Sequence, residues 1–181
     1  MLNKSEKIII VGASGSGKDW LLRQLQKEGL EISTKTTTRP QRKNETQFET
    51  YNFISNAEFK YLLEQNSFIC HQTFNVTPKD RNLETWHYGI SKDEFNKAQA
   101  FIMTPGELEQ LDKETRKGCF VVYLDIEREI REKRISGRND NNDSIKRRLD
   151  ADEKDFYNFG DYDLKITDPE FEVELVISLM D

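Results

Sequence analysis

Apolar residues are spaced in two different ways at the start of the chain. Residues 7–11 contain an unbroken apolar run after one lysine, as is typical of a strand that is buried on both faces. Residues 18–28 repeat their apolar positions at helical spacing and predict a helix, which Gly29 is placed to end. Residues 30–34 suit a second short strand. The chain therefore opens with a strand, a glycine-rich turn and a helix.

The middle of the chain carries strand patterns separated by short helices. Strands are predicted at 50–54, 67–74 and 86–90, where β-branched and aromatic residues gather. The polar stretch 75–85 lacks a period and predicts an extended loop. Capping boxes, in which a serine or threonine stands three residues before a glutamate, predict helices that begin after Ser55, Ser91 and Thr104.

Strand and helix patterns alternate in the second half of the chain. The helix that begins after Thr104 is predicted to end at Gly118. Core strands are predicted at 100–103, 120–124 and 164–167. Further helices are predicted at 126–136, at 144–157 and after Pro169.

This order of elements predicts the fold class. Strands that are joined by helices form parallel sheets with both faces covered, so we predict an α/β protein, a three-layer αβα sandwich with a parallel core sheet. Residues 1–34 and 92–181 are expected to form this core. The strand-rich residues 35–91 are expected to form an inserted, mostly β lobe.

Composition narrows the class of protein. A chain of 181 residues suits one compact domain with small inserted lobes. The net charge of −6 argues against a protein that coats nucleic acid, so an anion must be bound by a local basic cluster. Cys70 and Cys119 form no disulfide or metal-binding pattern and are interpreted as buried, reduced thiols. We see no secretory signal or membrane span and expect a cytoplasmic monomer or homodimer.

The turn between the first strand and the first helix has the sequence GASGSGKD, which completes the spacing GxxxxGK. Glycines let the backbone wind tightly around an anion, and successive N–H groups then point toward it. The next helix presents its positive end to the same anion, and Lys18 can reach the outer phosphates of a nucleoside triphosphate. The residues predicted to hold this phosphate tail are Gly12, Ala13, Ser14, Gly15, Ser16, Gly17, Lys18 and Asp19.

Asp19 stands where this motif usually has a serine or threonine that binds Mg²⁺. A carboxylate can also bind Mg²⁺, directly or through water. It is equally suited to the first turn of a helix, where the helix dipole favours an acid. Asp19 is therefore a candidate metal ligand, and both interpretations stay open.

A basic segment at residues 35–43 contains four cations and three hydroxyl side chains around a proline. Arginine offers a planar fork of donors that matches a phosphate or a carboxylate. The segment can hold a second phosphate, or it can be a solvated basic loop.

Other polar residues favour structural roles. His71 and His87 lack further ligands at metal-binding spacing. Asp125 ends an apolar strand, as a magnesium ligand would, but its place before a helix favours a capping role. The acidic run 150–155 is most simply a solvated helix face.

Taken together, these segments resemble the guanylate kinase-like family of P-loop nucleotide kinases over nearly the whole chain. GASGSGKD is similar to the family's phosphate loop, and TTTRPQR, followed by Glu45 and Tyr51, is similar to its acceptor-phosphate segment. Residues 86–89 resemble its N-Y-Y-G turn, and residues 162–168 resemble its terminal strand. Arg134 and Ser136-Gly137-Arg138 resemble the lid arginines of the family. Arg147-Arg148-Leu149 resembles the helix that follows them.

The resemblance implies phosphoryl transfer from ATP, with Mg²⁺, to a phosphate of a small nucleotide, and no role for nucleic acid. It implies that Lys18 and the loop amides hold the donor. It also implies that the acceptor is held by Lys35, Arg39, Arg42, Tyr51 and Tyr88. A small lid at about 134–147 is expected to close over the transferring group with Arg134, Arg138 and Arg148.

Departures from the family pattern gather at the positions that read the base. Lys35 stands at the family's serine, Cys70 at the glutamate that reads the guanine edge, and Ile90 at a usual serine or threonine. The segment 101–104 lacks the family's two aspartates. We therefore expect retained phosphate anchoring and rewritten base recognition. Candidate substitutes for the missing acids are Glu45, Glu84 and His71.

Three functions follow from these observations. The first is transfer of the γ-phosphoryl group of ATP to GMP or dGMP. The second is a kinase of ribose 1,5-bisphosphate, because members of that branch share the G-K-D ending and lack the guanine-reading acids, although TTTRPQR favours the nucleotide branch. The third is a non-catalytic guanylate kinase-like binding module, which the intact GxxxxGK motif disfavours.

Overall fold

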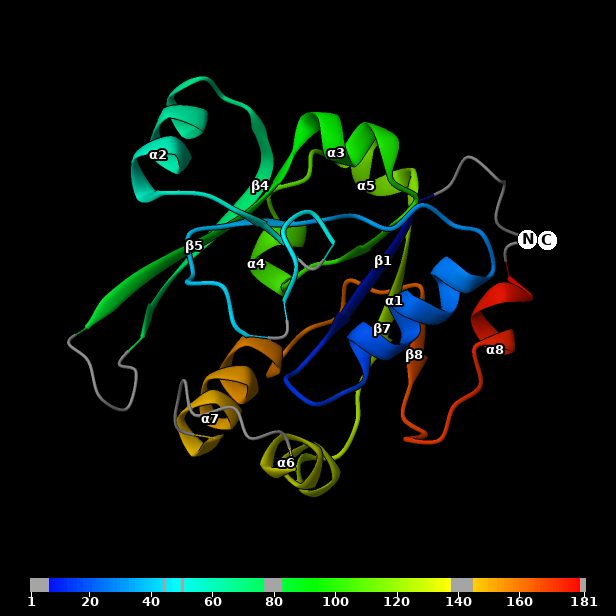
Figure 1. The fold of residues 1–181 in the computed structure, drawn as a ribbon. Helices are drawn as coiled ribbons and strands as arrows, with labels where there is room; N and C mark the ends of the chain where they lie inside the picture. Colours follow the sequence, from blue (N-terminus) through cyan, green and yellow to red (C-terminus); the bar gives the residue numbers. More distant parts are fainter. Residues whose placement is uncertain (1–6, 44, 50, 77–82, 138–144, 180–181) are drawn as a thin grey trace.

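The computed structural model describes residues 7–43, 45–49, 51–76, 83–137 and 145–179 (Figure 1). Two sheets and the helices around them make up the fold. The helices are α1 Lys18–Lys27, α2 Asn56–Glu64, α3 Lys92–Lys97, α4 Pro105–Leu108, α5 Lys113–Lys117, α6 Arg128–Ser136, α7 Ile145–Phe156 and α8 Glu174–Ile177.

Four parallel strands form the core sheet in the order β6-β1-β7-β8. Their bounds are β1 Lys7–Gly12, β6 Ala100–Ile102, β7 Cys119–Leu124 and β8 Leu164–Ile166. β1 lies in the middle, with Ile9 paired to Phe101 on one side and to Val121 on the other. Its carboxyl end leads directly into the glycine turn, which therefore lies at the edge where ligands bind in open α/β sheets.

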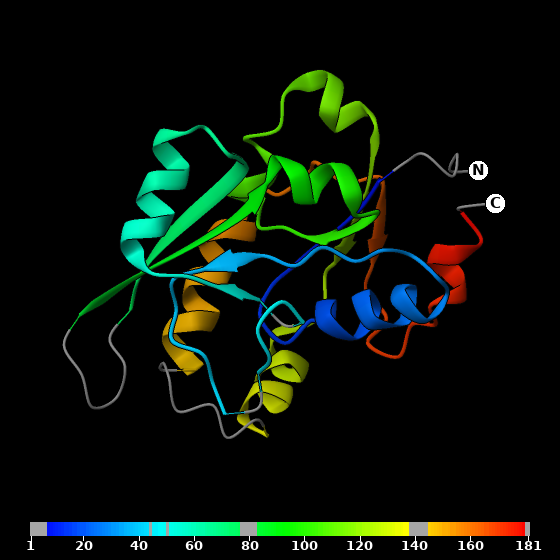
Figure 2. The same ribbon diagram turned by 45° about the horizontal axis from the view of Figure 1, so that its top comes forward.

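Alternate residues of β1 pack on opposite faces of this sheet. Ile8 and Ile10 belong to one buried cluster together with Leu21 of α1, and residues before and within α8 complete that cluster. Ile9 belongs to a second cluster together with Phe95 of α3. Figure 2 shows α1 and α8 on one side of the core sheet and α3 and α5 on the other. The predicted α/β sandwich with a parallel core sheet is confirmed.

A second sheet has the strand order β3-β2-β5-β4. Its strands are β2 Thr36–Thr37, β3 Asn52–Phe53, β4 Phe68–Val76 and β5 Glu84–Ser91. β5 is antiparallel to both of its neighbours, whereas β2 and β3 are parallel. All four strands come from the stretch predicted to be the inserted lobe, and the boundaries 35–91 stay a prediction.

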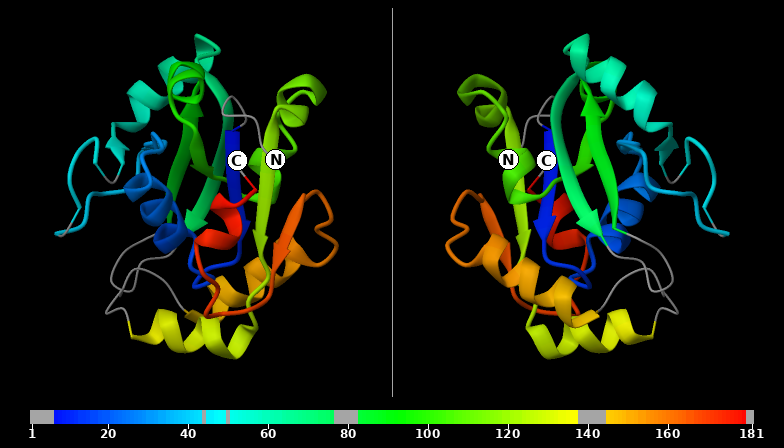
Figure 3. Two further views of the ribbon diagram at one scale, coloured as in Figure 1. Left: turned by 90° about the vertical axis from the view of Figure 1, so that its right-hand side faces the viewer. Right: turned by 90° about the vertical axis from the view of Figure 1, so that its left-hand side faces the viewer.

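Helix α2 covers one face of the second sheet. The ring of Phe59 stacks on His87 of β5, with centroids 5.1 Å apart, and on Phe68 of β4 at 4.6 Å. Figure 3 shows α2 and α6 at opposite ends of the molecule in both views. The other face of the second sheet is left for the acceptor residues described below.

Two predicted segments are wrong in the middle of the chain. The polar stretch 75–85 is not simply a loop, because β4 continues to Val76 and β5 begins at Glu84. The helix predicted from Thr104 to Gly118 is two short helices. The first ends at Leu108, and Asp112 caps the second, since its carboxylate accepts from the N–H groups of Glu114 and Thr115.

Three further predictions need correction. Residues 30–34 do not form a strand, since Ile32 makes one isolated bridge to Ala100. Pro169 does not open the last helix, which begins at Glu174. Asp125 does not cap a helix; its carboxylate pairs with Lys165 at 2.6 Å.

None of the described helices has both the length and the apolar character needed to cross a membrane. The predicted cytoplasmic location and the oligomeric state stay predictions.

Candidate active site

The stretch from Gly12 to Lys18 is wound into a tight loop between β1 and α1. Gly15 and Gly17 have φ values of 79° and 103°, which a residue with a Cβ atom rarely adopts. The N–H group of Ser16 donates to the Ala13 carbonyl at 3.2 Å and closes the turn. A Cβ atom at Gly12 would lie 2.6 Å from Ser16 Oγ, so the loop has no room for a side chain there. This geometry is the anion cradle that the motif predicts.

Lys18 begins α1 and lies across the loop. Its Nζ donates to the Ala13 carbonyl at 3.0 Å, and burial lowers the pKa of this ammonium below its usual value. The opposing charges of Asp19 and Asp152 raise the pKa in part, and the charges of Lys35 and Arg148 lower it further. These groups, from α1, α7 and the segment that holds Lys35, therefore lie within electrostatic reach of the loop.

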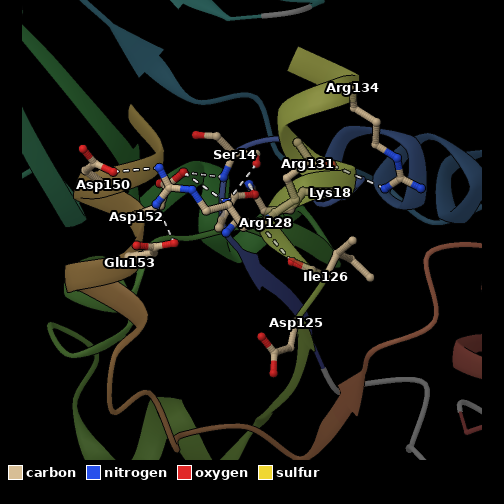
Figure 4. A network of polar contacts seen from close by, with 12 residues as sticks. Ser14, Lys18, Asp125, Ile126, Arg128, Arg131, Arg134, Asp150, Asp152 and Glu153 are labelled. Carbon is tan, nitrogen blue, oxygen red and sulfur yellow. Dashed lines mark hydrogen bonds and ion pairs between the residues drawn. The ribbon is translucent and has the colours of Figure 1, made fainter. Parts of the chain in front are cut away.

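Helix α7 contributes a contact that no local sequence pattern indicates. Asp152 accepts a hydrogen bond from the Ser14 N–H at 2.8 Å, and its carboxylate lies 3.9 Å from Arg131 Nη1 (Figure 4). Arg131 is buried, and its Nε donates to the Ile126 carbonyl at 2.8 Å. An anionic side chain thus occupies a backbone donor of the phosphate loop.

The same helix is tied to α6 by a second group of ion pairs. Arg128 pairs with Asp150 at 2.8 Å and with Glu153 at 2.6 Å, as Figure 4 shows. These three side chains are about one-third to one-half exposed, so the pairs contribute little to stability individually. The interpretation of the run 150–155 as a solvated face holds for Asp150 and Glu153 but is wrong for Asp152.

The predicted lid arginines have separate positions. Arg134 on α6 donates to the Pro169 carbonyl at 2.8 Å and to the Gly15 carbonyl at 3.4 Å, so it lies beside the phosphate loop. Arg148 on α7 lies close enough to Lys18 to affect its pKa. Arg138 and most of the predicted lid 134–147 fall outside the described residues. Closure of the three arginines over a transferring group stays a prediction.

A cavity of about 750 Å³ opens next to the loop. Its lining includes Gly15, Gly17, Trp20, Arg134, Pro169 and Phe171. The Trp20 ring meets Phe171 edge-on at 5.3 Å and stays 45% exposed, so an aromatic surface faces the cavity. Planar aromatic and guanidinium groups beside a phosphate cradle suit the base of a bound nucleotide.

A second cationic cluster lies on the second sheet. Arg39 is 5% exposed and pairs with Glu45 at 2.6 Å. Its guanidinium lies over the Tyr51 ring at 5.3 Å, and the rings of Tyr51 and Tyr88 meet edge-on at 6.1 Å. The backbone N–H group of Arg42 donates to the same Glu45 carboxylate at 2.8 Å. The structure therefore places Arg39, Arg42, Tyr51 and Tyr88 close together, and their binding of an acceptor phosphate stays a prediction.

This cluster faces the phosphate loop. Burial raises the pKa of Tyr51, and the nearby carboxylate of Asp19 raises it further, which places the tyrosine hydroxyl near the start of α1. Burial likewise raises the pKa of Tyr88, whose hydroxyl contacts Thr37 and Arg39. Both phenols are therefore neutral at pH 7 and can donate hydrogen bonds to an anion.

Lys35 is placed differently from the other predicted acceptor residues. Its Nζ donates to both carboxylate oxygens of Glu107 at 2.8 and 2.6 Å, and Glu107 Oε2 also accepts from the Thr104 N–H. Glu107 is buried and lies in α4, which packs against β4. The sequence predicted this acid only as half of a capping box, although the apolar residues around it indicated burial.

Asp19 is the one residue that was predicted to bind Mg²⁺. In the described part of the chain, no group of three or more His, Cys, Asp or Glu side chains could hold a metal ion. Asp19 is exposed in the first turn of α1. One carboxylate suits Mg²⁺ only together with substrate phosphates and water, which is the usual way in which this ion is bound at nucleotide sites. The donor set fits Mg²⁺ that arrives with a nucleotide.

Cys70 and Cys119 are buried, free thiols, as predicted.

A phosphate loop at the carboxyl end of β1, opposite a guanidinium and tyrosine cluster for a second anion, defines the class of P-loop kinases. Comparisons with known proteins agree. A family model described as guanylate kinase matches residues 4–177. The chain is 29% identical to the guanylate kinase of a Nostoc species and 30% identical to that of Trichormus variabilis, each over 177 residues that cover 93% of this chain and 84% of the relative. The chain belongs to the guanylate kinase family.

A solved structure gives the same fold. The crystal structure of guanylate kinase from Anaplasma phagocytophilum matches with a TM-score of 0.67 at 20% identity, over 98% of this chain and 86% of that one. A likeness at this identity concerns the fold, and it includes the second sheet because nearly the whole chain is covered.

Proposed function

We propose that this enzyme transfers the γ-phosphoryl group of ATP to the phosphate of GMP or dGMP. The observation that carries this proposal is the pair of facing anion sites. The phosphate loop holds Lys18, and Tyr51, which packs with Arg39 and Tyr88, lies within electrostatic reach of Asp19 next to Lys18. Phosphoryl transfer requires two phosphates in line and charge stabilisation between them, because little covalent chemistry is asked of the protein.

The donor is proposed to lie along the loop. Backbone N–H groups from Ala13 to Asp19 bind its phosphates, and Lys18 contacts the outer ones. An ammonium carries three donors, so its bond to the Ala13 carbonyl leaves others for phosphate oxygens. The adenine is proposed to enter the 750 Å³ cavity, between Trp20 and Arg134. Asp152 must leave the Ser14 N–H when the phosphates bind.

The acceptor phosphate is proposed to bind between Arg39 and Arg42, with hydroxyl donors from Tyr51 and Tyr88. Glu45 holds Arg39 in place, so its guanidinium is oriented before the acceptor arrives. Arg148 and Arg138 are proposed to offset the charge that develops during transfer.

Mg²⁺ is the proposed cofactor, with Asp19 as its protein ligand. Asp19 would hold the ion at the start of α1, where it would supply positive charge to the phosphates of the donor. Replacement of Asp19 by serine should keep activity and shift the Mg²⁺ concentration needed for half-maximal rate. An unchanged Mg²⁺ titration would leave Asp19 as a residue of the helix start only.

The decisive experiment measures ADP release from ATP and Mg²⁺ with a panel of acceptors. The panel is GMP, dGMP, AMP, CMP, UMP and ribose 1,5-bisphosphate. Release with GMP or dGMP supports the proposal, and the Lys18→Ala variant controls for contaminating kinases. ADP release with ribose 1,5-bisphosphate alone would indicate a ribose 1,5-bisphosphate kinase instead. No release with any acceptor would favour a binding module.

A further inference from the structure

Positions that depart from the family pattern come together at one end of the second sheet. Cys70 and Ile90 are partners across β4 and β5, and both are buried. Burial and the Glu107 carboxylate raise the pKa of the Cys70 thiol to about 12, so this thiol is neutral. The same carboxylate binds Lys35 and caps the helix that begins after Thr104. The four departures therefore form one cluster around Glu107.

Lys35 projects to the face of the sheet that holds the acceptor phosphate. Thr37 and Gln72 are both register partners of Tyr88. Side chains alternate along a strand, so Lys35, two residues before Thr37, lies on the face that carries Tyr88, and α2 covers the opposite face. Lys35 and Arg39 are separated by about 13 Å along an extended chain. This separation is comparable with the length of a nucleoside.

The pair offers a hydrogen-bond donor to the cleft. The side chain of Glu107 is 1% exposed, and its oxygens already accept from Lys35 and from the Thr104 N–H. The side chain of Lys35 is 15% exposed, and two of its three N–H groups bind Glu107. A ligand at this end therefore meets the ammonium before it can meet the acid. The hydroxyl of Thr104 is occupied by the side-chain oxygen of Gln72 at 2.5 Å.

We propose that the Lys35–Glu107 pair reads the base of the acceptor by donating to a ring carbonyl oxygen, so the enzyme takes 6-oxopurine monophosphates and is indifferent to a 2-amino group. This inference rests on the proposed function and names its substrate class. Guanine and hypoxanthine both present an oxygen at position 6, whereas adenine presents an amino group there and is rejected. Glu107 is 1% exposed and already binds Lys35 and the Thr104 N–H, so the inference assigns it no bond to the 2-amino group.

The first test uses the wild-type protein. We would measure kcat/KM for GMP, IMP and AMP at saturating ATP and Mg²⁺. The expected values for GMP and IMP agree within about 10-fold, and AMP is at least about 100-fold poorer. A preference for GMP over IMP beyond this limit, or efficient use of AMP, would overturn the inference and leave the proposed function intact. Turnover of none of the three, nor of dGMP measured beside them, would overturn the proposed function itself.

The second test removes both charges together, because a single substitution would leave the other charge buried and unpaired. The double variant Lys35→Met with Glu107→Gln keeps an oxygen that can accept from the Thr104 N–H. Its kcat/KM for GMP should fall about 10- to 100-fold, mostly through KM, while AMP does not fall, so the selectivity ratio collapses.

The exposed pair Lys117–Glu114, with the same charges at 2.8 Å, supplies the matched control Lys117→Met with Glu114→Gln, whose ratio should be unchanged. An unchanged GMP to AMP ratio in a folded Lys35 and Glu107 variant would show a structural role only and would contradict the inference. Thermal unfolding reports whether the variant folds, and if it does not, the wild-type panel alone decides.

Discussion

The phosphate loop and the proposed acceptor cluster on the second sheet offer donors to an anion by opposite means. The loop uses backbone N–H groups, and its shape depends on Gly15 and Gly17 at positive φ. The acceptor cluster uses side chains from separate segments, with Arg39 held by Glu45 and by the Tyr51 ring. A site made of backbone is encoded in one short stretch of sequence. A site made of side chains depends on neighbours far apart in the sequence, and one substituted side chain can change what it recognises.

The largest effect is expected in the loop. Lys18→Ala should lower kcat at least about 100-fold and leave the fold intact, because the ammonium acts on charge that develops in the transition state and not on the core. Steady-state kinetics and circular dichroism measure the two quantities. Retained turnover with any accepted acceptor would show that the loop does not hold the donor as described.

Arg39→Ala tests the side-chain site. The KM of the acceptor should rise about 10- to 100-fold, as expected for the loss of a hydrogen bond between charged groups, while the KM of ATP changes little. Arg39→Lys keeps a cation beside Glu45 and should recover only part of the affinity, because it lacks the planar fork. Arg23→Ala, an exposed arginine on α1, is the control. If Arg39→Ala and Arg39→Lys bound the acceptor as tightly as the Arg23→Ala control, Arg39 would not bind the acceptor.

Asp152 connects the two modes of binding, since here a side chain occupies a backbone donor. Asp152→Asn keeps an oxygen near the Ser14 N–H but removes the negative charge from the path of the triphosphate. The KM of ATP should fall about 3- to 10-fold, which corresponds to about 1 kcal/mol. Glu109→Gln controls for the loss of one surface charge. A higher KM for ATP in the Asp152 variant would instead show that this carboxylate assists binding.

The smallest effect concerns stability. Although burial alone would raise the pKa of Glu45, the hydrogen bond from Arg39 holds it below its usual value of 4.5. The pKa is lower in the folded chain, so the stabilisation is fully present above the unfolded value and is lost as the pH falls through the folded one.

Urea unfolding at pH 7 should show Glu45→Gln to be less stable than the wild type by about 1–3 kcal/mol, and this difference should shrink below pH 4.5. Glu64→Gln, an exposed acid on α2, should show no such convergence. If the difference in unfolding free energy between wild type and Glu45→Gln stayed constant across the pH range, the charge of Glu45 beside Arg39 would not be the source of the stabilisation.

Much of the core could be predicted because local chemistry and tertiary packing agree there. The loop and the buried strands β1 and β7 follow directly from glycine spacing and apolar runs. The helix starts at Ser55 and Thr104 form the predicted capping boxes. The strand ends beyond Phe74 were missed because three of the four residues that were read as loop, Asn75, Glu84 and Thr85, are polar, and the buried Val76 alone makes no hydrophobic alternation.

The candidate site was predictable only where a motif is local. Glu107 and Asp152 each lie on a helix where an acid is unremarkable, one in a capping box and one in an acidic run. Their partners, Lys35 and the Ser14 N–H, are 72 and 138 residues away along the chain. A contact of this kind is decided by how the helices pack on the sheets, which no local pattern in the sequence records.

The place of Trp20 gives the protein a built-in optical reporter. Its indole is 45% exposed at the mouth of the cavity beside the loop, whereas Trp86, the other tryptophan of the chain, is 9% exposed in the second sheet. Solvent-exposed indoles emit at longer wavelengths than buried ones, so Trp20 and Trp86 have different emission maxima. Occupancy of the donor side can be followed by fluorescence quenching of the native chain, with no label attached.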